Sequence, residues 1–286
     1  MEATETHSPD TIQQAATALK RIRPAYAQIV DYHAQLFSEQ EKAQQGLDLH
    51  LENVTLPEID PSVGRGFAVL DLRQWPINLP ATQALMVAIC DLTLQAGLKT
   101  ADSAQHLKTA LAQGKVDIGA LVAGYLAQDG ACLEDQGAEL QVAPEFIHFA
   151  VYQGMLPSIR VCAEYLQTHL EKSPSLKQPA CPICGSAPAL ALYSRDGQRH
   201  VFCGFCWHLW PMKRVYCPFC QNKHNTSLQY LDLEEEKEYR VDVCDQCRKY
   251  LKSIDLRQTE RVIYPRLEHA ATVHLDLKAQ QAGYGV

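Results

Sequence analysis

Cys181-Pro-Ile-Cys184, Cys203-Gly-Phe-Cys206, Cys217-Pro-Phe-Cys220 and Cys244-Asp-Gln-Cys247 are the four Cys-x-x-Cys pairs that decide the fold of this 286-residue chain. They hold eight of its eleven cysteines, while Cys90, Cys132 and Cys162 are scattered through the first 180 residues. A two-residue gap lets both sulfurs of a pair face one centre from a tight turn, and two such turns supply a tetrahedral four-sulfur site. The pattern therefore predicts two mononuclear metal sites, with these eight cysteines as ligands: Cys181, Cys184, Cys203, Cys206, Cys217, Cys220, Cys244 and Cys247.

Metal binding explains these pairs better than disulfides or redox-active dithiols do. The first residues, Met1-Glu-Ala-Thr-Glu5, have neither the basic nor the apolar segment of an export signal. We therefore expect a cytoplasmic protein, in a compartment where thiols stay reduced. A thioredoxin-type dithiol would need a βαβ setting, and no pair is followed by the His that c-type haem attachment requires. Four sulfur ligands also close a site, so no catalytic position is expected and the chain is not predicted to be an enzyme.

The order of the pairs along the chain indicates which of them share a metal. Sequential pairing joins the first pair with the second and the third with the fourth. Each joining loop is then long enough for one β-hairpin, as in a rubredoxin-like or zinc-ribbon module. Cross-braced pairing would interleave the two sites, and we favour the sequential arrangement. Iron and zinc both accept four sulfurs in this geometry, so the residues leave the metal open.

Short strands are predicted around the cysteines because the segments there are rich in aromatic and β-branched residues. They cover residues 190–193, 199–202, 228–233 and 239–243. Such strands bury too little apolar surface to be stable alone, and small domains of this kind usually need a metal. We expect a first metal ribbon over residues 181–212, a second over 213–258 and a C-terminal helix over 259–284.

Residues 1–175 instead show helical periodicity and predict an all-α domain of five to seven helices, which makes the fold class α+β. The segment 172–180 carries Pro174 and Pro179 and predicts a linker. Asp10 is expected to cap a helix that begins at Thr11, and Gly46 is a stop signal for the helical segment before it. Further helices are expected from Pro80 to Gly97, from Ser103 to Gly114, after a cap at Asp117, and from Pro144 to about Leu170, with a kink or break at Pro157.

Charge and hydropathy exclude two classes of partner. The longest apolar run, Ala84 to Cys90, is far shorter than the ~20 residues of a membrane helix, so no membrane insertion is expected. The chain carries a formal charge of −7. Residues 181–252 hold ten basic and eight acidic side chains, and eight thiolates with two divalent ions bring the loaded module to about −2. Nucleic-acid binding is therefore not expected. We expect instead a scaffold that binds another protein.

Residues 181–284 resemble the formate dehydrogenase accessory protein family (FdhE-type). The resemblance rests on the four ordered pairs and on their flanks, which are Cys181-Pro-Ile-Cys-Gly-Ser-Ala-Pro188, Arg199, Trp210, Arg214, Leu228-Gln-Tyr230, Tyr250-Leu-Lys252, Leu275-Asp276 and Gly283-Tyr284. The helical half is similar only in length and general character. The chain departs from the family at two places. Glu268-His269 stands where the family usually has two aspartates, and Gln221 directly follows the pair Cys217-Pro-Phe-Cys220.

The resemblance implies an accessory or assembly protein for the maturation of respiratory formate dehydrogenase. Such a protein binds the catalytic subunit in the cytoplasm before export by the twin-arginine route, and the family is associated with iron in rubredoxin-like sites. The alternatives are a ribbon protein that binds nucleic acid or another partner, and an iron or redox sensor or electron carrier. Homo-oligomer formation stays open.

Four residues near the metal sites are candidates for contacting the client protein. They are Arg199, Trp210, Arg214 and Tyr250. Tryptophan, tyrosine and arginine dominate interface hot spots, and Trp210 and Arg214 lie in the short connector between the two modules. The competing interpretation places the aromatic residues in the small core of the ribbons.

Overall fold

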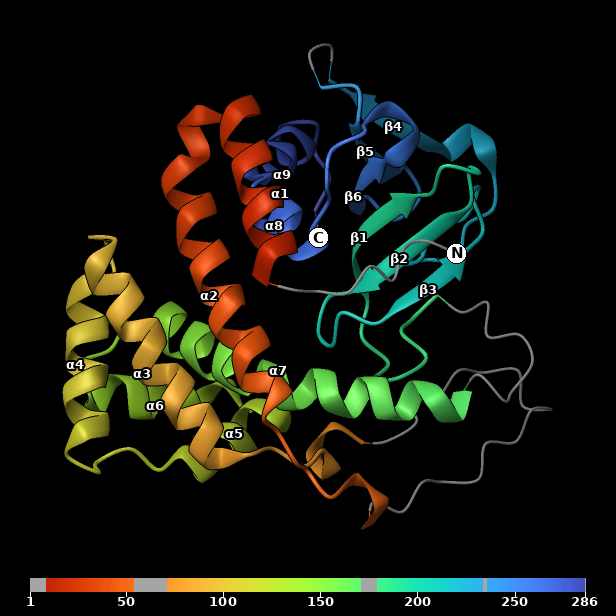
Figure 1. The fold of residues 1–286 in the computed structure, drawn as a ribbon. Helices are drawn as coiled ribbons and strands as arrows, with labels where there is room; N and C mark the ends of the chain where they lie inside the picture. Colours follow the sequence, from red (N-terminus) through yellow and green to blue (C-terminus); the bar gives the residue numbers. More distant parts are fainter. Residues whose placement is uncertain (1–8, 54–70, 171–178, 234–235, 286) are drawn as a thin grey trace.

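The computed structural model describes residues 9–53, 71–170, 179–233 and 236–285. Up to residue 170 the described part is helical, which confirms the predicted all-α region (Figure 1). Its helices are α1 (Pro9–Ile22), α2 (Ala27–Gln45), α3 (Leu79–Gln95), α4 (Ala101–Ala112), α5 (Ile118–Leu126), α6 (Gly130–Glu139) and α7 (Pro144–Leu170). Short 3-10 turns lie at Pro24–Tyr26, Leu51–Asn53 and Leu72–Gln74.

Several helix ends follow the signals in the sequence. Gly46 caps the C-terminus of α2, and Pro80 lies in the first turn of α3, where its missing N–H costs nothing. The Asp117 carboxylate caps α5 by accepting a hydrogen bond from the backbone N–H of Ala120 at 2.9 Å. These ends were predictable because a cap acts on its own first or last turn.

Other helix signals were wrong. Asp10 lies inside the first turn of α1 rather than before it, and α1 ends at Ile22 because Pro24 opens a 3-10 turn. The break predicted at Pro157 is absent, because α7 continues as one helix past this buried proline, and the alternative, a kink, stays a prediction. Helix α6, which begins after Asp129, was not predicted. Most of the predicted linker, residues 171–178, lies outside the described residues.

The second half of the chain forms one six-stranded sheet. Its strands are β1 (Pro188–Tyr193), β2 (Arg199–Cys203), β3 (Leu209–Met212), β4 (Leu228–Asp232), β5 (Tyr239–Cys244) and β6 (Tyr250–Asp255), in the order β3-β2-β1-β6-β5-β4. Neighbours pair antiparallel except β1 and β6, which pair in parallel with Leu190 opposite Lys252. The two predicted ribbons are therefore halves of a single sheet, joined along β1 and β6, and β3 and β6 had not been predicted.

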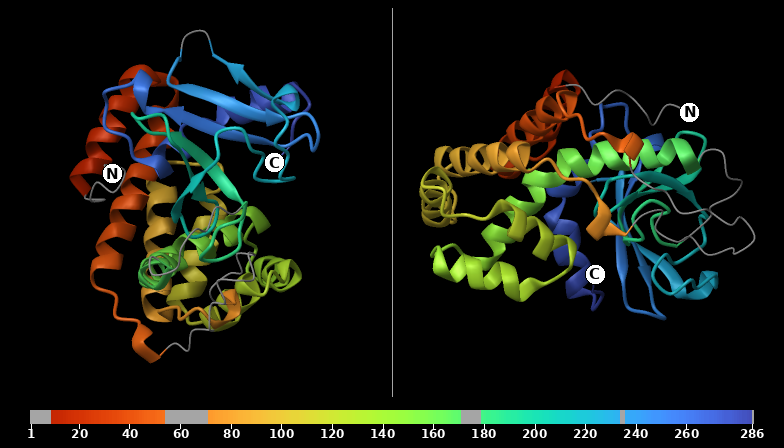
Figure 2. Two further views of the ribbon diagram at one scale, coloured as in Figure 1. Left: turned by 90° about the vertical axis from the view of Figure 1, so that its right-hand side faces the viewer. Right: turned by 90° about the horizontal axis from the view of Figure 1, so that it is seen from below.

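The C-terminal segment folds as two helices where one had been expected. They are α8 (Pro265–Ala270) and α9 (Val273–Gln281). Helix α8 contacts α1, α2 and β1, and α9 contacts β5 and β6. Seen from below, α3 to α6 lie on one side of the molecule and the strands on the other (Figure 2). The hydrophobic core is continuous between them, since one buried cluster includes Leu36 of α2, Ile159 of α7 and Val201 of β2.

Candidate metal centres

The cysteine pairs gather into two separate clusters at the sheet. Cluster 1 consists of Cys181, Cys184, Cys203 and Cys206, and cluster 2 of Cys217, Cys220, Cys244 and Cys247. Within each cluster the four sulfurs lie within 4.8 Å of one another. This is the sequential pairing that the sequence predicted, and each cluster is a group that can hold a metal ion.

The two clusters share one construction plan. Each cluster is built on three consecutive antiparallel strands. One Cys-x-x-Cys turn precedes the first strand, and the other Cys-x-x-Cys turn connects the second strand to the third. Cluster 1 is built in this way on β1, β2 and β3, and cluster 2 on β4, β5 and β6. The hairpin of the second and third strands therefore brings the sulfurs at its turn close to the pair of sulfurs before the first strand.

The distances between sulfurs fit a tetrahedral metal site and not disulfides. The Cys181 and Cys206 sulfurs are 3.6 Å apart, and those of Cys184 and Cys203 are 3.3 Å apart. In cluster 2 the separations are 3.7 Å, for Cys217 with Cys247 and for Cys220 with Cys244. Metal–sulfur bonds of about 2.3 Å in a tetrahedron place sulfurs about 3.8 Å apart, whereas a disulfide joins them at about 2.0 Å. All eight cysteines are free thiols, so each cluster suits a metal ion that is bound by four sulfur ligands.

A repeated backbone turn holds the sulfurs in place. The residue after each pair has a positive φ, and these residues are Gly185 (77°), Trp207 (60°), Gln221 (62°) and Arg248 (59°). In every turn the first cysteine donates its N–H to the carbonyl oxygen five residues later, at 2.9 to 3.0 Å. The sequence indicated this conformation only at Gly185. Elsewhere a residue with a Cβ accepts the left-handed conformation because the turn around the cluster requires it.

The clusters differ in their exposure. All four cysteines of cluster 1 are buried, whereas Cys220 and Cys247 of cluster 2 are only half-buried. Helix α7 closes cluster 1 on one side, since the Tyr152 hydroxyl donates a hydrogen bond to the carbonyl oxygen of Phe205 at 2.7 Å. The metal of cluster 2 would therefore lie closer to solvent.

The thiols of cluster 1 act on each other's acidity. Hydrogen bonds from Cys181, and then from Cys203 and Cys206, lower the pKa of Cys184. Burial raises the pKa of the Cys181 and Cys206 thiols. Binding a metal releases their protons, which makes occupancy weaker in acid.

Three of the four candidate client-binding residues lie inside the protein. Arg199 is 3% exposed, and its guanidinium bonds the Asp242 carboxylate at 3.1 Å and the Tyr216 carbonyl oxygen at 2.9 Å. Trp210 is buried, and the buried Tyr250 donates its hydroxyl to Asp276 at 2.9 Å. Arg214 alone among the four has an exposed side chain. Client binding remains a prediction for all four.

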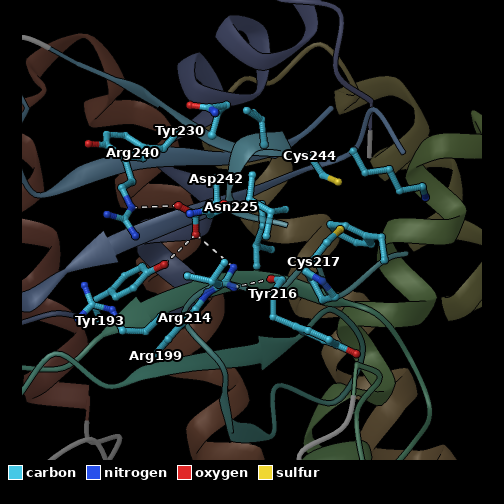
Figure 3. A pocket seen from close by; sticks show the side chains of 18 residues that line it. Tyr193, Arg199, Arg214, Tyr216, Cys217, Asn225, Tyr230, Arg240, Asp242 and Cys244 are labelled. Carbon is cyan, nitrogen blue, oxygen red and sulfur yellow. Dashed lines mark hydrogen bonds and ion pairs between the residues drawn. The ribbon is translucent and has the colours of Figure 1, made fainter. Parts of the chain in front are cut away.

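Arg214 borders a pocket that the sequence analysis did not identify. The pocket has a volume of about 250 Å³ and extends to Cys217 and Cys244 of cluster 2. Tyr193, Arg240 and Asp242 also line it (Figure 3). One signal was present in the sequence, because alternation along β5 places Arg240 and Asp242 on the same face of the sheet.

The unusual Glu268-His269 pair also lies inside the protein. Glu268 is fully buried and binds the Arg261 guanidinium at 2.9 Å and the Tyr239 hydroxyl. The His269 ring packs edge-on against Trp207, with centroids 5.7 Å apart. These contacts brace α8 against β5 and the turn of cluster 1. In the described ranges, no helix is long and apolar enough to cross a membrane.

The fold and the two clusters define a metal-binding protein in which a rubredoxin-like pair of modules shares one sheet and packs on a helical layer. Comparison with known proteins agrees. The family described as "FdhE, C-terminal domain" matches residues 215–285. An FdhE homolog from Aquifex aeolicus is 24% identical over 261 residues, which cover 90% of this chain and 82% of that protein. FdhE of Escherichia coli O157:H7 is 24% identical over 83% of this chain and 73% of its own.

A solved structure shows the same fold. The crystal structure of the FdhE protein from Pseudomonas aeruginosa superposes with a TM-score of 0.64 at 20% sequence identity, over 98% of this chain and 95% of that one. The helical half is included in that match, although its sequence had shown only a general likeness. The chain is thus similar to FdhE-type proteins in sequence, and it shares its fold with one of them over nearly its whole length.

Proposed function

We propose that this chain is an accessory protein for the maturation of respiratory formate dehydrogenase. In this proposal it binds the catalytic subunit in the cytoplasm before export and performs no catalysis of its own. The observation that supports it most strongly is the pair of four-cysteine clusters in a chain that is FdhE-like over most of its length. A site with four protein ligands offers no open position for substrate, so it suits a scaffold.

The eight clustered cysteines would bind two metal ions, iron as the family resemblance implies, or zinc. Bound metal would supply folding energy to strands that bury little apolar surface of their own. Cys203→Ser/Cys206→Ser should lower the metal content from two ions to one per chain, as measured by elemental analysis of the purified protein. Cys132→Ser is the matched control, since this thiol lies outside both clusters. Two ions per chain in the Cys203/Cys206 variant would refute the ligand assignment.

Affinity capture tests the client. The tagged full-length chain is purified from cells that express a respiratory formate dehydrogenase, and its partners are identified by mass spectrometry. We expect the catalytic subunit to be enriched with its export signal uncleaved. Capture should be lost in the Cys203/Cys206 variant and kept in Cys132→Ser. Recovery of nucleic acid, or of mature enzyme only, would contradict the proposal.

A further inference from the structure

The pocket beside cluster 2 has mixed walls of aromatic and basic residues. Figure 3 shows Tyr193 and Arg240 towards one end and the cluster residues Cys217 and Cys244 towards the other. Arg214 lies between the two ends. At about 250 Å³, the pocket has room for a few side chains of another chain and is too small for a folded element.

Basic side chains in the lining of the pocket outnumber carboxylates. Its lining includes four basic side chains, Arg199, Arg214, Arg240 and Lys249, and a single carboxylate, Asp242. That carboxylate is fully engaged. It pairs with Arg199 at 3.1 Å and with Arg240 at 2.9 Å, and it accepts hydrogen bonds from Tyr193 and Ser253.

Arg214 and Lys249 are therefore available to a ligand. Both side chains are exposed, and neither forms an ion pair within the described residues. The Lys249 ammonium lies 5.4 Å from the centre of the Phe219 ring. Two unpaired cations on the rim of one pocket favour a ligand with at least two negative groups.

Apolar groups on the rim show what else the ligand must carry. Tyr230 is 56% exposed and Val215 is 50% exposed, and both line the pocket. The Arg240 guanidinium stacks on the Tyr193 ring, 4.1 Å from its centre, and also lies 5.2 Å from the centre of the Tyr230 ring. Prearranged tyrosine and arginine side chains around a pocket are typical of protein-binding hot spots.

We propose that this pocket binds an acidic segment of the client polypeptide that carries both carboxylates and apolar side chains. The carboxylates would meet Arg214 and Lys249, and the apolar side chains would pack on Tyr230 and Val215. This inference rests on the proposed function, because the client is the formate dehydrogenase catalytic subunit. Nucleic acid fits less well. It needs an extended basic surface, whereas this chain carries a net charge of −7.

Charge reversal on the rim tests the proposal. The variant is Arg214→Glu/Lys249→Glu. The matched control is Lys99→Glu/Lys115→Glu, which makes the same charge change at two exposed lysines of the helical layer. Binding is measured with purified catalytic subunit and with a fluorescein-labelled peptide of alternating Glu and Leu. A peptide of alternating Gln and Leu serves as the uncharged probe.

We expect the rim variant to weaken both interactions by about tenfold or more, and the control to stay within about twofold. The Glu–Leu peptide should bind the unmodified protein better than the Gln–Leu peptide, and its affinity should fall as salt is raised. Arg214→Lys should retain most of the binding. Metal content is measured on each variant. If the rim variant loses metal, Arg214→Gln/Lys249→Gln replaces it, with a smaller loss of binding expected.

The outcomes separate this inference from the proposed function. Client binding that is equal in the rim variant and the control overturns the pocket while leaving the accessory function intact. Peptide binding that depends on the rim, without any capture of the client, supports the pocket and counts against the accessory function. Tighter binding of a single-stranded RNA oligomer than of the acidic peptide, with the same dependence on the rim, overturns the acidic-segment inference.

Discussion

Glu41 of α2 is a buried carboxylate that lies among buried basic side chains. Its side chain pairs with the buried guanidinium of Arg160 and accepts a hydrogen bond from the Tyr264 hydroxyl at 2.9 Å. A second buried guanidinium, that of Arg266, stacks on the Phe37 ring at 4.0 Å and binds Gln40. Glu41 therefore pairs directly with one buried guanidinium and acts electrostatically on a second at the junction of α2, α7 and α8.

Glu41→Gln should be strongly destabilising, because it leaves the buried Arg160 with only the exposed Glu164, 4.0 Å away, as a counter-charge. We expect the free energy of unfolding to fall by about 3–5 kcal/mol, as is usual when one partner of a buried pair is removed. Urea unfolding followed by circular dichroism measures the change. Glu39→Gln, on the same helix, removes an exposed pair with Lys42 and should cost at most about 1 kcal/mol. Equal losses in the two variants would show that the buried pair contributes nothing special.

At the scale of single residues, local chemistry was predictable and long-range partners were not. The eight cysteines identify themselves because a pair and its turn occupy a few adjacent residues. Glu41 gave no such signal, since Arg160 and Tyr264 come from distant parts of the chain. Arg199 was expected to be a candidate surface contact for the same reason, because its partner Asp242 belongs to the other half of the sheet.

At the scale of elements, the strands that were missed are those whose side chains break the usual pattern. Strand β3 contains Pro211, which a central strand excludes, but β3 is the edge of the sheet and tolerates it. Strand β6 is buried throughout although it contains Lys252 and Asp255. Lys252 pairs with Asp276 of α9 and Asp255 with Arg257. Partners outside a strand thus made its polar residues compatible with burial.

An ion-pair cluster ties the first helices to the sheet and to α9. The Glu236 carboxylate binds Arg23 through two hydrogen bonds of 2.8 and 2.9 Å, and His274 at 2.9 Å. Partial burial opposes ionisation of Glu236. The hydrogen bonds from His274 and Arg23 outweigh it and hold its pKa at about 2, below the ordinary 4.5. A carboxyl whose pKa is lowered by folding adds stability that is present above pH 4.5 and is lost as the pH falls towards 2.

Glu236→Gln should therefore flatten the acid limb of the stability profile. The loss at neutral pH should be on the order of 1 kcal/mol, since the group is partly solvated, and the variant and the parent should converge near pH 2. Thermal melts between pH 7 and pH 2 measure this. Glu260→Gln, at a pair whose carboxylate side chain is 85% exposed, is the control and should leave the profile unchanged. A constant difference at every pH would contradict the linkage to this carboxyl.

The two hairpins that carry the clusters should also differ in how readily they release metal. Cluster 1 is enclosed under α7, whereas cluster 2 presents the half-buried Cys220 and Cys247. A chelator should therefore remove the metal in two phases, with cluster 2 emptied first, because local opening exposes it more easily. Cys217→Ser/Cys220→Ser should abolish the fast phase, and Cys203→Ser/Cys206→Ser the slow one. A single phase in the unmodified protein would mean that the clusters open together.

At the scale of the whole molecule, the halves of the chain are less separate than the sequence indicates. The abrupt change in cysteine content near residue 180 predicted a helical domain followed by two tandem metal ribbons. In the described residues, however, buried side chains of α2 and α7 belong to the same apolar cluster as Cys181, Cys203 and Trp210. Composition shows where the chain changes its chemistry, but it does not show which surfaces are buried together.

This shared core predicts that metal loss reaches the helices. We expect complete removal of both ions, by a chelator with a thiol reductant present, to lower the melting temperature of the helical signal by about 10 °C or more. The reason is that α7 and α8 lose the rigid surface against which Tyr152 and Leu267 pack. Far-ultraviolet circular dichroism follows the helices, and near-ultraviolet dichroism follows the aromatic side chains packed in the sheet. The two signals should melt together in the loaded protein, and returning two equivalents of metal should restore the original transition. If the helical signal melts at the same temperature with and without metal, the helical layer is a separate folding unit and the continuous core does not couple it to the sheet.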